Sequence, residues 1–283
     1  MKKIIQRLIV FIVGFPALVS VVIFFPQCNH LLLNLVCIAF TILGAVEFRN
    51  ILTHKNLVIS VPEAVIMGAI SPVAWTVVVS FGVAGNIVPG AFILGACWLL
   101  VSHIFAAGEK LDLYIGRTTA GFAIMIYPGL FMAWIIQMAI FPKAGLVILV
   151  YFLMGLLNDA AAWLAGILFG DGNRGVVPVS PKKSVAGFIG GLAVSVGTGL
   201  FAVKFFPAAF TSTLIPSYLA GALLGLGAGA AAILGDLAES ALKRSAGVKD
   251  SGTLILGRGG ALDSIDSMAL AAPVYYIIYQ VLF

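Results

Sequence analysis

Charged residues are scarce in this chain, because only 10% of its 283 residues are Asp, Glu, Lys or Arg. A soluble domain carries about 25% charged residues. Hydrophobic residues make up 61% of the sequence, and the mean hydropathy is +1.14. This composition excludes an ordinary soluble protein and indicates a polytopic membrane protein.

Residues that build soft-metal and redox sites are also rare, since the chain has three cysteines and three histidines. They are scattered through apolar stretches, and none of their spacings is that of a zinc or redox motif. The basic residues do not alternate with aromatic residues as in RNA-binding segments, so no nucleic-acid partner is expected. The scattered residues are Cys28, Cys37, Cys97, His30, His54 and His103.

What the sequence does contain is a series of apolar runs, each near the ~20 residues that a helix needs to cross a bilayer. They predict an all-α, polytopic integral membrane protein with about nine transmembrane helices. The first run is too long for a signal peptide and lacks a small-residue cleavage site, so we expect it to be retained. The predicted spans are 4–26, 31–52, 61–83, 87–106, 115–140, 145–170, 184–206, 214–235 and 264–283.

Basic residues fall almost entirely on one side of these predicted helices. Lys143 and Lys204 lie on the opposite side, and the other 14 of the 16 basic residues share the side of the N-terminus. Because loops rich in Lys and Arg stay in the cytoplasm, the N-terminus is predicted to be cytoplasmic and the C-terminus outside. Apart from Asp159, the acidic residues also lie in or next to the cytoplasmic loops, so any chemistry is expected to face the cytoplasm.

Polar and charged residues concentrate in one segment near the C-terminal end, Gly235–Ser267. If its first part is helical, Asp236, Ser240 and Lys243 recur at i, i+4 and i+7 and share one stripe. A solvated loop between two spans would explain single charges in this segment. It would not explain carboxylates repeated at helical spacing on two different helices.

The far end of the same segment combines carboxylates with glycines. Asp263 and Asp266 are i, i+3 neighbours and are expected to share a face of the last helix. The glycine-rich stretch Gly257–Gly260 precedes that helix, and its backbone N–H groups can approach an anion closely. Carboxylates beside an anion need a cation between them, and hard oxygen ligands favour Mg²⁺. We therefore predict a carboxylate–metal–phosphate site, with Asp236, Asp263 and Asp266 as the metal ligands.

Two other polar stretches precede this segment. A carboxylate inside a transmembrane helix costs several kcal/mol unless it is paired or hydrated, so Asn158 and Asp159 are predicted to form a polar wall of the substrate cavity. A buried hydrogen bond to another helix is the structural alternative for them. Ser180 is predicted as a helix N-cap, which would place Lys182 and Lys183 on a helix N-terminus that attracts phosphate.

Two further features have packing or interfacial interpretations. Glu47 and Arg49 lie at the inner end of the second predicted helix and are expected to be interfacial. Glycines recur at close spacing in the seventh and eighth predicted helices and are expected to let these helices approach closely. These glycines are Gly190, Gly191, Gly197, Gly199, Gly221, Gly225 and Gly229.

A long pattern of fixed spacing runs through the C-terminal polar segment. It reads Ser240-x-Leu242-Lys243-Arg244-x4-Lys249-Asp250-x-Gly252, followed by Gly259-Gly260-x-x-Asp263-x-x-Asp266. This pattern resembles the signature of the phosphatidate cytidylyltransferases (CDP-diacylglycerol synthases), and the two earlier polar stretches resemble further motifs of that family. The resemblance covers roughly the last 130 residues. Arg258 stands where the family has a His, and Ser264 where it has an Arg.

The resemblance implies an enzyme that transfers a cytidylyl group from CTP to phosphatidate, giving CDP-diacylglycerol and pyrophosphate. It implies a region of five spans at 1–143, a catalytic region of four spans at 144–283, and a place in the inner membrane of a bacterium. It also implies Mg²⁺, and leaves a second cation and a homodimer open. The implied catalytic residues are Asp236, Asp263, Asp266, Lys243 and Arg244. The implied substrate-binding residues are Asn158, Asp159, Ser180, Lys182, Lys183, Ser240, Lys249, Asp250, Arg258, Gly259 and Gly260.

Two other functions are compatible with the same residues. A CTP-dependent kinase of a polyprenol-type lipid alcohol would use a similar membrane site and release CDP instead of pyrophosphate. A transporter of organic anions would use Asp159 within the membrane and a basic vestibule. The polar residues cluster at one face of the predicted bundle and not at its midplane, which favours an enzyme.

Overall fold

The computed structural model describes residues 2–105, 107–255, 257 and 259–283, and for residues 2–11, 109 and 110 it describes the backbone alone. In this part of the chain the regular structure is helical apart from two isolated β-bridges, which confirms the all-α prediction. The elements are α1 (Lys2–Phe24), α2 (Gln27–Thr53), α3 (Val61–Phe81), α4 (Ile87–Val101), α5 (Glu109–Asp112), α6 (Tyr114–Ile124), a π-helical turn (Met125–Leu130), α7 (Phe131–Gln137), a 3-10 turn (Met138–Ile140), α8 (Ala144–Phe169), α9 (Val185–Phe205), α10 (Ser217–Ser245) and α11 (Leu262–Leu282).

Seven of the described helices are long and apolar enough to cross a membrane. Two shorter apolar helices, Ile12–Phe24 and Ile87–Val101, fall within the first and fourth predicted spans. Each predicted span therefore coincides with an apolar helix, and the chain is a multi-pass membrane protein by helix composition. The number of crossings and the side of each terminus stay predictions. The seven long helices are Gln27–Thr53, Val61–Phe81, Tyr114–Ile140, Ala144–Phe169, Val185–Phe205, Ser217–Ser245 and Leu262–Leu282.

The largest difference from the predicted limits is at α10, which continues ten residues beyond 235 to Ser245. Its extension is helical and carries the first polar residues of the C-terminal segment, which is the condition under which Asp236, Ser240 and Lys243 share one stripe. The helix ends in a Schellman motif, in which Gly247 N–H donates to Arg244 O at 3.1 Å and Val248 N–H to Lys243 O at 3.0 Å. Gly247 has a φ of 75°, a left-handed conformation that favours glycine.

The helices form two compact units. The first contains Met1–Ala139 and Leu242–Ile265, and the second contains Ile140–Ala241 and Asp266–Phe283. The chain passes from one unit to the other close to the predicted division between 143 and 144, and a C-terminal segment then returns to the first unit. The functional division into 1–143 and 144–283 stays a prediction.

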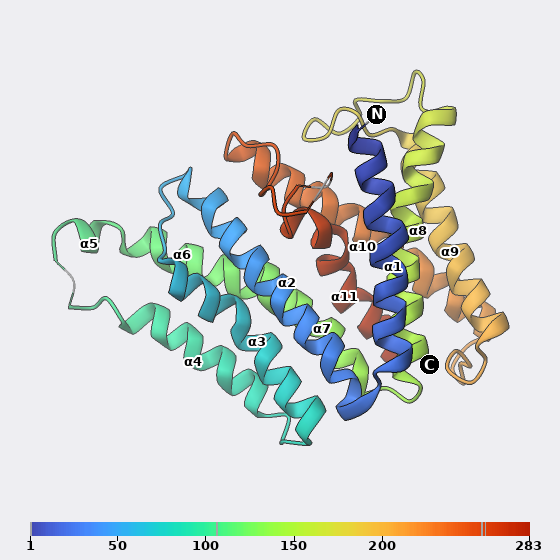
Figure 1. Ribbon diagram of the computed structural model, residues 1–283, viewed down its shortest axis with the longest axis horizontal. Helices are drawn as coiled ribbons and strands as arrows, with labels where there is room; N and C mark the ends of the chain where they lie inside the picture. The colour runs from blue at the N-terminus through green and yellow to red at the C-terminus, as the bar shows by residue number, and fades with distance from the viewer. Residues whose placement is uncertain (1, 106, 256, 258) are drawn as a thin grey trace. The chain divides into compact units, whose positions relative to one another are not determined.

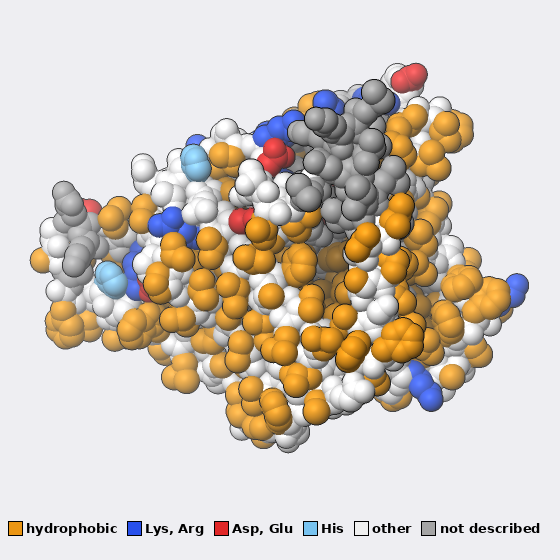
Figure 2. Space-filling view, in the orientation of Figure 1, with side chains coloured by type: hydrophobic (Ala, Val, Ile, Leu, Met, Phe, Trp, Pro, Cys, Tyr) orange, Lys and Arg blue, Asp and Glu red, His pale blue; other side chains and the backbone are white. Residues whose placement is uncertain are grey.

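In the first unit, α2 and α3 pack side by side (Figure 1). A Cβ atom on Gly68 would lie 2.6 Å from the methyl group of Ala45, so a glycine is needed for this approach. Arg117 of α6 forms a buried ion pair with Glu63 of α3, and Trp98 Nε1 of α4 donates to Glu63 Oε1 at 3.1 Å. The side chains visible over α2, α3 and α4 are mostly hydrophobic (Figure 2), as expected of a surface that faces lipid.

In the second unit, α8 and α9 lie side by side (Figure 1), and glycines bring α10 against α9. A Cβ atom on Gly221 would lie 2.7 Å from Gly199 O, and one on Gly229 would lie 2.6 Å from the Cβ of Ser195. A Cβ atom on Gly225 would overlap Ser195 O. These contacts confirm the predicted close approach for Gly199, Gly221, Gly225 and Gly229. Gly190 and Gly191 instead lie against α8, and a Cβ atom on Gly197 would meet open space, so for these three glycines the prediction is wrong.

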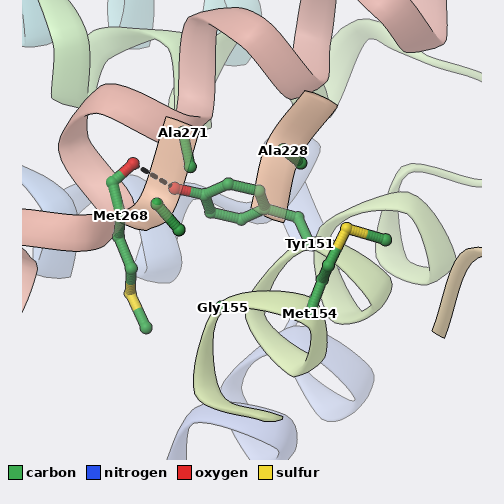
Figure 3. Close-up of a pocket in the computed structure, with 7 residues that line it drawn as sticks. Tyr151, Met154, Gly155, Ala228, Met268 and Ala271 are labelled. Carbon is green, nitrogen blue, oxygen red and sulfur yellow. Dashed lines mark hydrogen bonds between the residues drawn. The ribbon is translucent and has the colours of Figure 1, made fainter. Parts of the chain in front are cut away.

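A small apolar cavity of about 10 Å³ lies among α8, α10 and α11 of the second unit. Figure 3 shows the ring of Tyr151 lying across it, with its hydroxyl donating to Met268 O at 2.6 Å. A volume of this size holds about one water molecule. The cavity is therefore a packing gap between side chains such as Met154 and Ala228, and it is too small for a nucleotide or a lipid head group.

Candidate active site

The loop between α10 and α11 is held in a tight turn. Ile255 N–H donates to Gly259 O at 2.7 Å, and Gly259 N–H donates to Ile255 O at 3.0 Å. Gly259 has a φ of 117°, and a Cβ atom there would overlap Asp263 Oδ2, so only glycine fits. Arg258, predicted to bind substrate, lies outside the described residues.

Asp263 is the centre of a hydrogen-bond network in the first unit. Its Oδ2 accepts from Ser251 N–H at 2.9 Å, from Ser251 Oγ at 2.8 Å and from Gly260 N–H at 2.7 Å. Its Oδ1 forms an ion pair with Lys243. The side chains of Lys243 and Asp263 are only 11% and 7% exposed, so the pair is shielded from water. The structure thus brings together three residues that the sequence predicted for the site, Lys243, Gly260 and Asp263.

Glu47 of α2 is a second carboxylate in this network, and the sequence did not predict it there. Its Oε1 accepts from Ala261 N–H at 3.0 Å, and its Oε2 accepts from Leu262 N–H at 2.8 Å and lies 3.0 Å from Ser251 Oγ. Glu47 therefore caps the start of α11, where N–H groups lack partners within the helix. The available signal was a carboxylate in an apolar helix, which we interpreted as interfacial.

Asp236 and Lys183 form the principal ion pair of the second unit. Lys183 Nζ lies 2.5 Å from Asp236 Oδ2, and Ser240 Oγ lies 3.5 Å from Asp236 Oδ1. The side chain of Asp236 is 33% exposed, so this carboxylate is accessible from outside the protein. The structure thus joins two predicted elements, the lysine motif before α9 and the stripe on α10.

Acidic side chains accumulate around Asp266 in the second unit. Asp236, Glu239 and Asp159 all lie within electrostatic reach of its carboxylate, and their negative charges repel it. Ser267 Oγ lies 3.5 Å from Asp159 Oδ2, so α8 and α11 meet at this point. Glu239 is completely buried, and it is not among the residues that the sequence predicts for the site.

Asn158 joins three helices of the second unit. Its Nδ2 donates to Ser195 Oγ of α9 at 2.8 Å and lies 3.4 Å from Gly229 O of α10. The residue is 1% exposed. The buried hydrogen bond between helices, which the sequence left open as an alternative, is therefore present. A contact of Asn158 with substrate stays a prediction.

The prediction that Ser180 caps a helix is wrong. The helix α9 begins five residues later, and Ser184 is its N-cap, with Ser184 Oγ accepting from Gly187 N–H at 3.0 Å. Val185 N–H donates to Asn173 O at 3.1 Å, and this contact with the preceding loop fixes the start of the helix. Lys182 and Lys183 consequently precede the helix and are not in its first turn.

The remaining predicted residues lie on the surface of the first unit or in the loop before α9. Arg244 is exposed, and its Nη1 donates to Val248 O at 3.1 Å, which supports the end of α10. Three other predicted residues are also exposed side chains, available to a charged ligand. These residues are Lys182, Lys249 and Asp250.

Metal binding can be assessed from the carboxylates themselves. Among the residues that the structure describes, no three or more His, Cys, Asp or Glu side chains are grouped so as to hold a metal ion. The donor chemistry nonetheless suits a hard divalent cation, because Asp236 and Asp266 are carboxylate oxygen donors whose negative charges repel each other. A carboxylate offers about four lone-pair sites, so Asp263 Oδ1 retains capacity beside its contact with Lys243. A Mg²⁺ site formed by Asp236, Asp263 and Asp266 stays a prediction.

Comparison with protein families gives a match over nearly the whole chain. The model described as "Cytidylyltransferase family" matches residues 5–282. The match therefore includes the N-terminal helices, for which the sequence motifs gave little support, as well as the polar C-terminal segment.

Individual relatives carry a more specific name. A phosphatidate cytidylyltransferase of Synechocystis sp. is 38% identical over 143 residues, which are 50% of this chain and 46% of the relative. The Haemophilus influenzae protein of that name is 38% identical over 142 residues, 49% of this chain and 47% of the relative. The chain thus spans about half the length of these two relatives. The Thermotoga maritima protein of that name is 31% identical over 207 residues, 68% of each chain.

Proposed function

This chain belongs to the cytidylyltransferase family, and from that premise we propose that it transfers a cytidylyl group from CTP to phosphatidate, giving CDP-diacylglycerol and pyrophosphate. The observation that carries the proposal is the family match over residues 5–282, together with relatives named phosphatidate cytidylyltransferase. The seven long apolar helices support it, because the lipid substrate resides in a bilayer.

The reaction requires little proton transfer. The phosphate monoester of phosphatidate has a second pKa of about 6, so it is largely a dianion at neutral pH. One of its oxygens attacks the α-phosphorus of CTP, a new P–O bond forms, and the bond from the α-phosphorus to the bridging oxygen breaks. The electron pair leaves with pyrophosphate, and no strong general base is needed.

The main requirement is to reduce repulsion between two anionic substrates. In this proposal the cationic heads of Lys183 and Lys243 contact phosphate oxygens. A carboxylate partner holds each head in place. The exposed side chains of Lys182, Arg244 and Lys249 supply further positive charge for the triphosphate. Fixing the lysine heads in advance lowers the reorganisation needed when charge develops on the leaving group.

A divalent cation completes the charge balance. Mg²⁺ held by Asp236, Asp263 and Asp266 would act as a Lewis acid on the phosphoryl oxygens when bound. Asp236 and Asp266 lie within electrostatic reach of each other, so a bound cation would reduce the repulsion between their carboxylates.

We place the protein in the inner membrane of a bacterium, with its N-terminus and the site on the cytoplasmic side. The support is the distribution of basic residues along the sequence and the bacterial origin of the relatives. In this orientation CTP reaches the site from the cytoplasm, and phosphatidate enters sideways from the bilayer with its acyl chains remaining in lipid.

The test is a product analysis with purified protein in detergent. The protein is incubated with CTP, phosphatidate and Mg²⁺, the lipid product is identified by mass spectrometry, and pyrophosphate is assayed separately. We expect CDP-diacylglycerol and pyrophosphate in equal amounts, and no product when Mg²⁺ is removed by a chelator. Release of CDP with phosphorylation of a lipid alcohol would instead identify a kinase, and flux into liposomes without covalent product would identify a transporter.

A pair of variants tests whether the predicted site carries the activity. Asp236→Asn removes a predicted metal ligand and the partner of Lys183, and we expect it to lower kcat by about 10²–10³-fold. Asp171→Asn makes the same chemical change at a fully exposed loop residue, and we expect it to leave turnover unchanged. Equal activity of the two variants would refute the role of Asp236.

A further inference from the structure

We propose that Glu47 is a positioning residue for the reaction, which orients Asp263 and, through it, the head of Lys243. This inference rests on the proposed function, because it concerns the same site. Glu47 belongs to α2, which lies outside the C-terminal segment that carries the predicted site residues.

Glu47 holds the backbone at the start of α11. It accepts hydrogen bonds from two backbone N–H groups at the start of α11, Ala261 at 3.0 Å and Leu262 at 2.8 Å. Asp263 follows directly on the same helix. Because a helix start is a short rigid unit, fixing these two N–H groups also fixes the backbone from which the Asp263 side chain projects.

Glu47 and Asp263 both lie within hydrogen-bond distance of the Ser251 hydroxyl. Ser251 Oγ lies 3.0 Å from Glu47 Oε2 and 2.8 Å from Asp263 Oδ2, and it lies 3.3 Å from the backbone N of Asp263. A hydroxyl has one proton to donate, so the two carboxylates compete for it. Glu47 therefore acts on Asp263 both through the backbone and through a common hydrogen-bond donor.

The loop between α10 and α11 fits tightly around the Glu47 carboxylate. A Cβ atom on Gly260 would overlap Glu47 Oε2, and one on Gly252 would lie 2.5 Å from Glu47 Oε1. The two glycines of the loop thus leave room for this side chain. A helix cap alone would require neither contact, so the loop is shaped to receive the carboxylate.

The experiment compares three variants of the full chain in the CTP and phosphatidate assay. Glu47→Gln keeps the shape of the side chain but replaces one acceptor oxygen with an N–H₂ group that faces other donors. Glu47→Asp keeps both oxygens on a shorter side chain. Glu63→Gln is the matched control, since it makes the same change in the same unit at a carboxylate bonded to Arg117 and Trp98.

For a positioning role we expect Glu47→Gln to lower kcat about 10–100-fold, the usual cost of losing an outer orienting partner. The KM for CTP should stay within about threefold, because the interaction acts on the reacting geometry and not on nucleotide binding in general. Glu47→Asp should recover part of the lost kcat. Glu63→Gln should lower the unfolding temperature with kcat per folded molecule unchanged.

The positioning role of Glu47 and the proposed function can be refuted separately. If the wild-type protein makes product and Glu47→Gln has wild-type kcat, the positioning role is refuted and the function stands. If the wild-type protein makes no CDP-diacylglycerol, hydrogen–deuterium exchange in detergent still tests the positioning role. Glu47→Gln should then speed exchange of the amides in residues 251–263, and unchanged exchange there would overturn the inference.

Discussion

The ion pair between Lys243 and Asp263 offers a direct energetic test of the site that does not depend on activity. Both side chains are nearly buried, and Asp263 also accepts three hydrogen bonds from the loop. Removing one partner of a buried ion pair costs about 3–5 kcal/mol, because the other charge stays buried without compensation. We therefore expect Lys243→Met and Asp263→Asn each to lower the free energy of unfolding by about 3 kcal/mol or more.

The double variant, Lys243→Met with Asp263→Asn, isolates the interaction energy between these two side chains from their contacts with other residues. With both charges removed, neither is left buried alone, so the combined loss should be smaller than the sum of the single losses by about 1–3 kcal/mol. The assay is equilibrium unfolding in mixed micelles with increasing dodecyl sulfate, followed by far-ultraviolet circular dichroism. Losses that add to within about 0.5 kcal/mol would refute the coupling. Asp171→Asn, at an exposed ion pair of 4.0 Å, should leave the unfolding curve unchanged.

Two further predictions concern glycines. Gly225→Val should prevent accumulation of folded protein, because its side chain would overlap Ser195 O between α9 and α10, whereas Gly197→Ala, with open space around it, should fold normally; gel filtration in detergent distinguishes them. Gly259→Ala should lower turnover at least about tenfold, because alanine is strained at this φ and its methyl group would displace Asp263. Comparable turnover of the Gly259→Ala variant and the wild-type protein would show that the loop adapts without cost.

The helices could be predicted from the sequence because hydropathy acts locally. Each apolar run contains the information that makes it a helix in lipid, since a backbone without water must form its own hydrogen bonds. The glycine spacing on α10 was also informative, because only small residues permit its close contact with α9, whereas three of the glycines on α9 do not face α10.

The start of α9 shows where local patterns fail. Ser180 followed by Pro181 has the composition of a helix start, yet the helix begins after Ser184. Asn173 fixes the position at which α9 begins, since its backbone oxygen accepts from Val185 N–H and its side-chain oxygen accepts from Ala186 N–H at 3.3 Å. A contact made by a residue of the preceding loop thus outweighed a favourable local sequence.

The sequence predicted only those parts of the site whose residues lie close together along the chain. The pairing of Lys243 with Asp263 joins residues 20 positions apart, within one recognisable segment. The contacts of Glu47 join residues more than 200 positions apart, and no periodicity or motif connects them. Only the folded chain shows that a carboxylate of α2 completes the loop before α11.

That separation has a consequence for biosynthesis. Glu47 enters the membrane early, but the amide of Leu262 is made 215 residues later. At about 5–20 residues per second, the carboxylate waits on the order of 10–40 s for the partners that stabilise it. A nascent chain that stalls before residue 262 therefore lacks the Leu262 amide, and the Glu47 carboxylate is left without this partner.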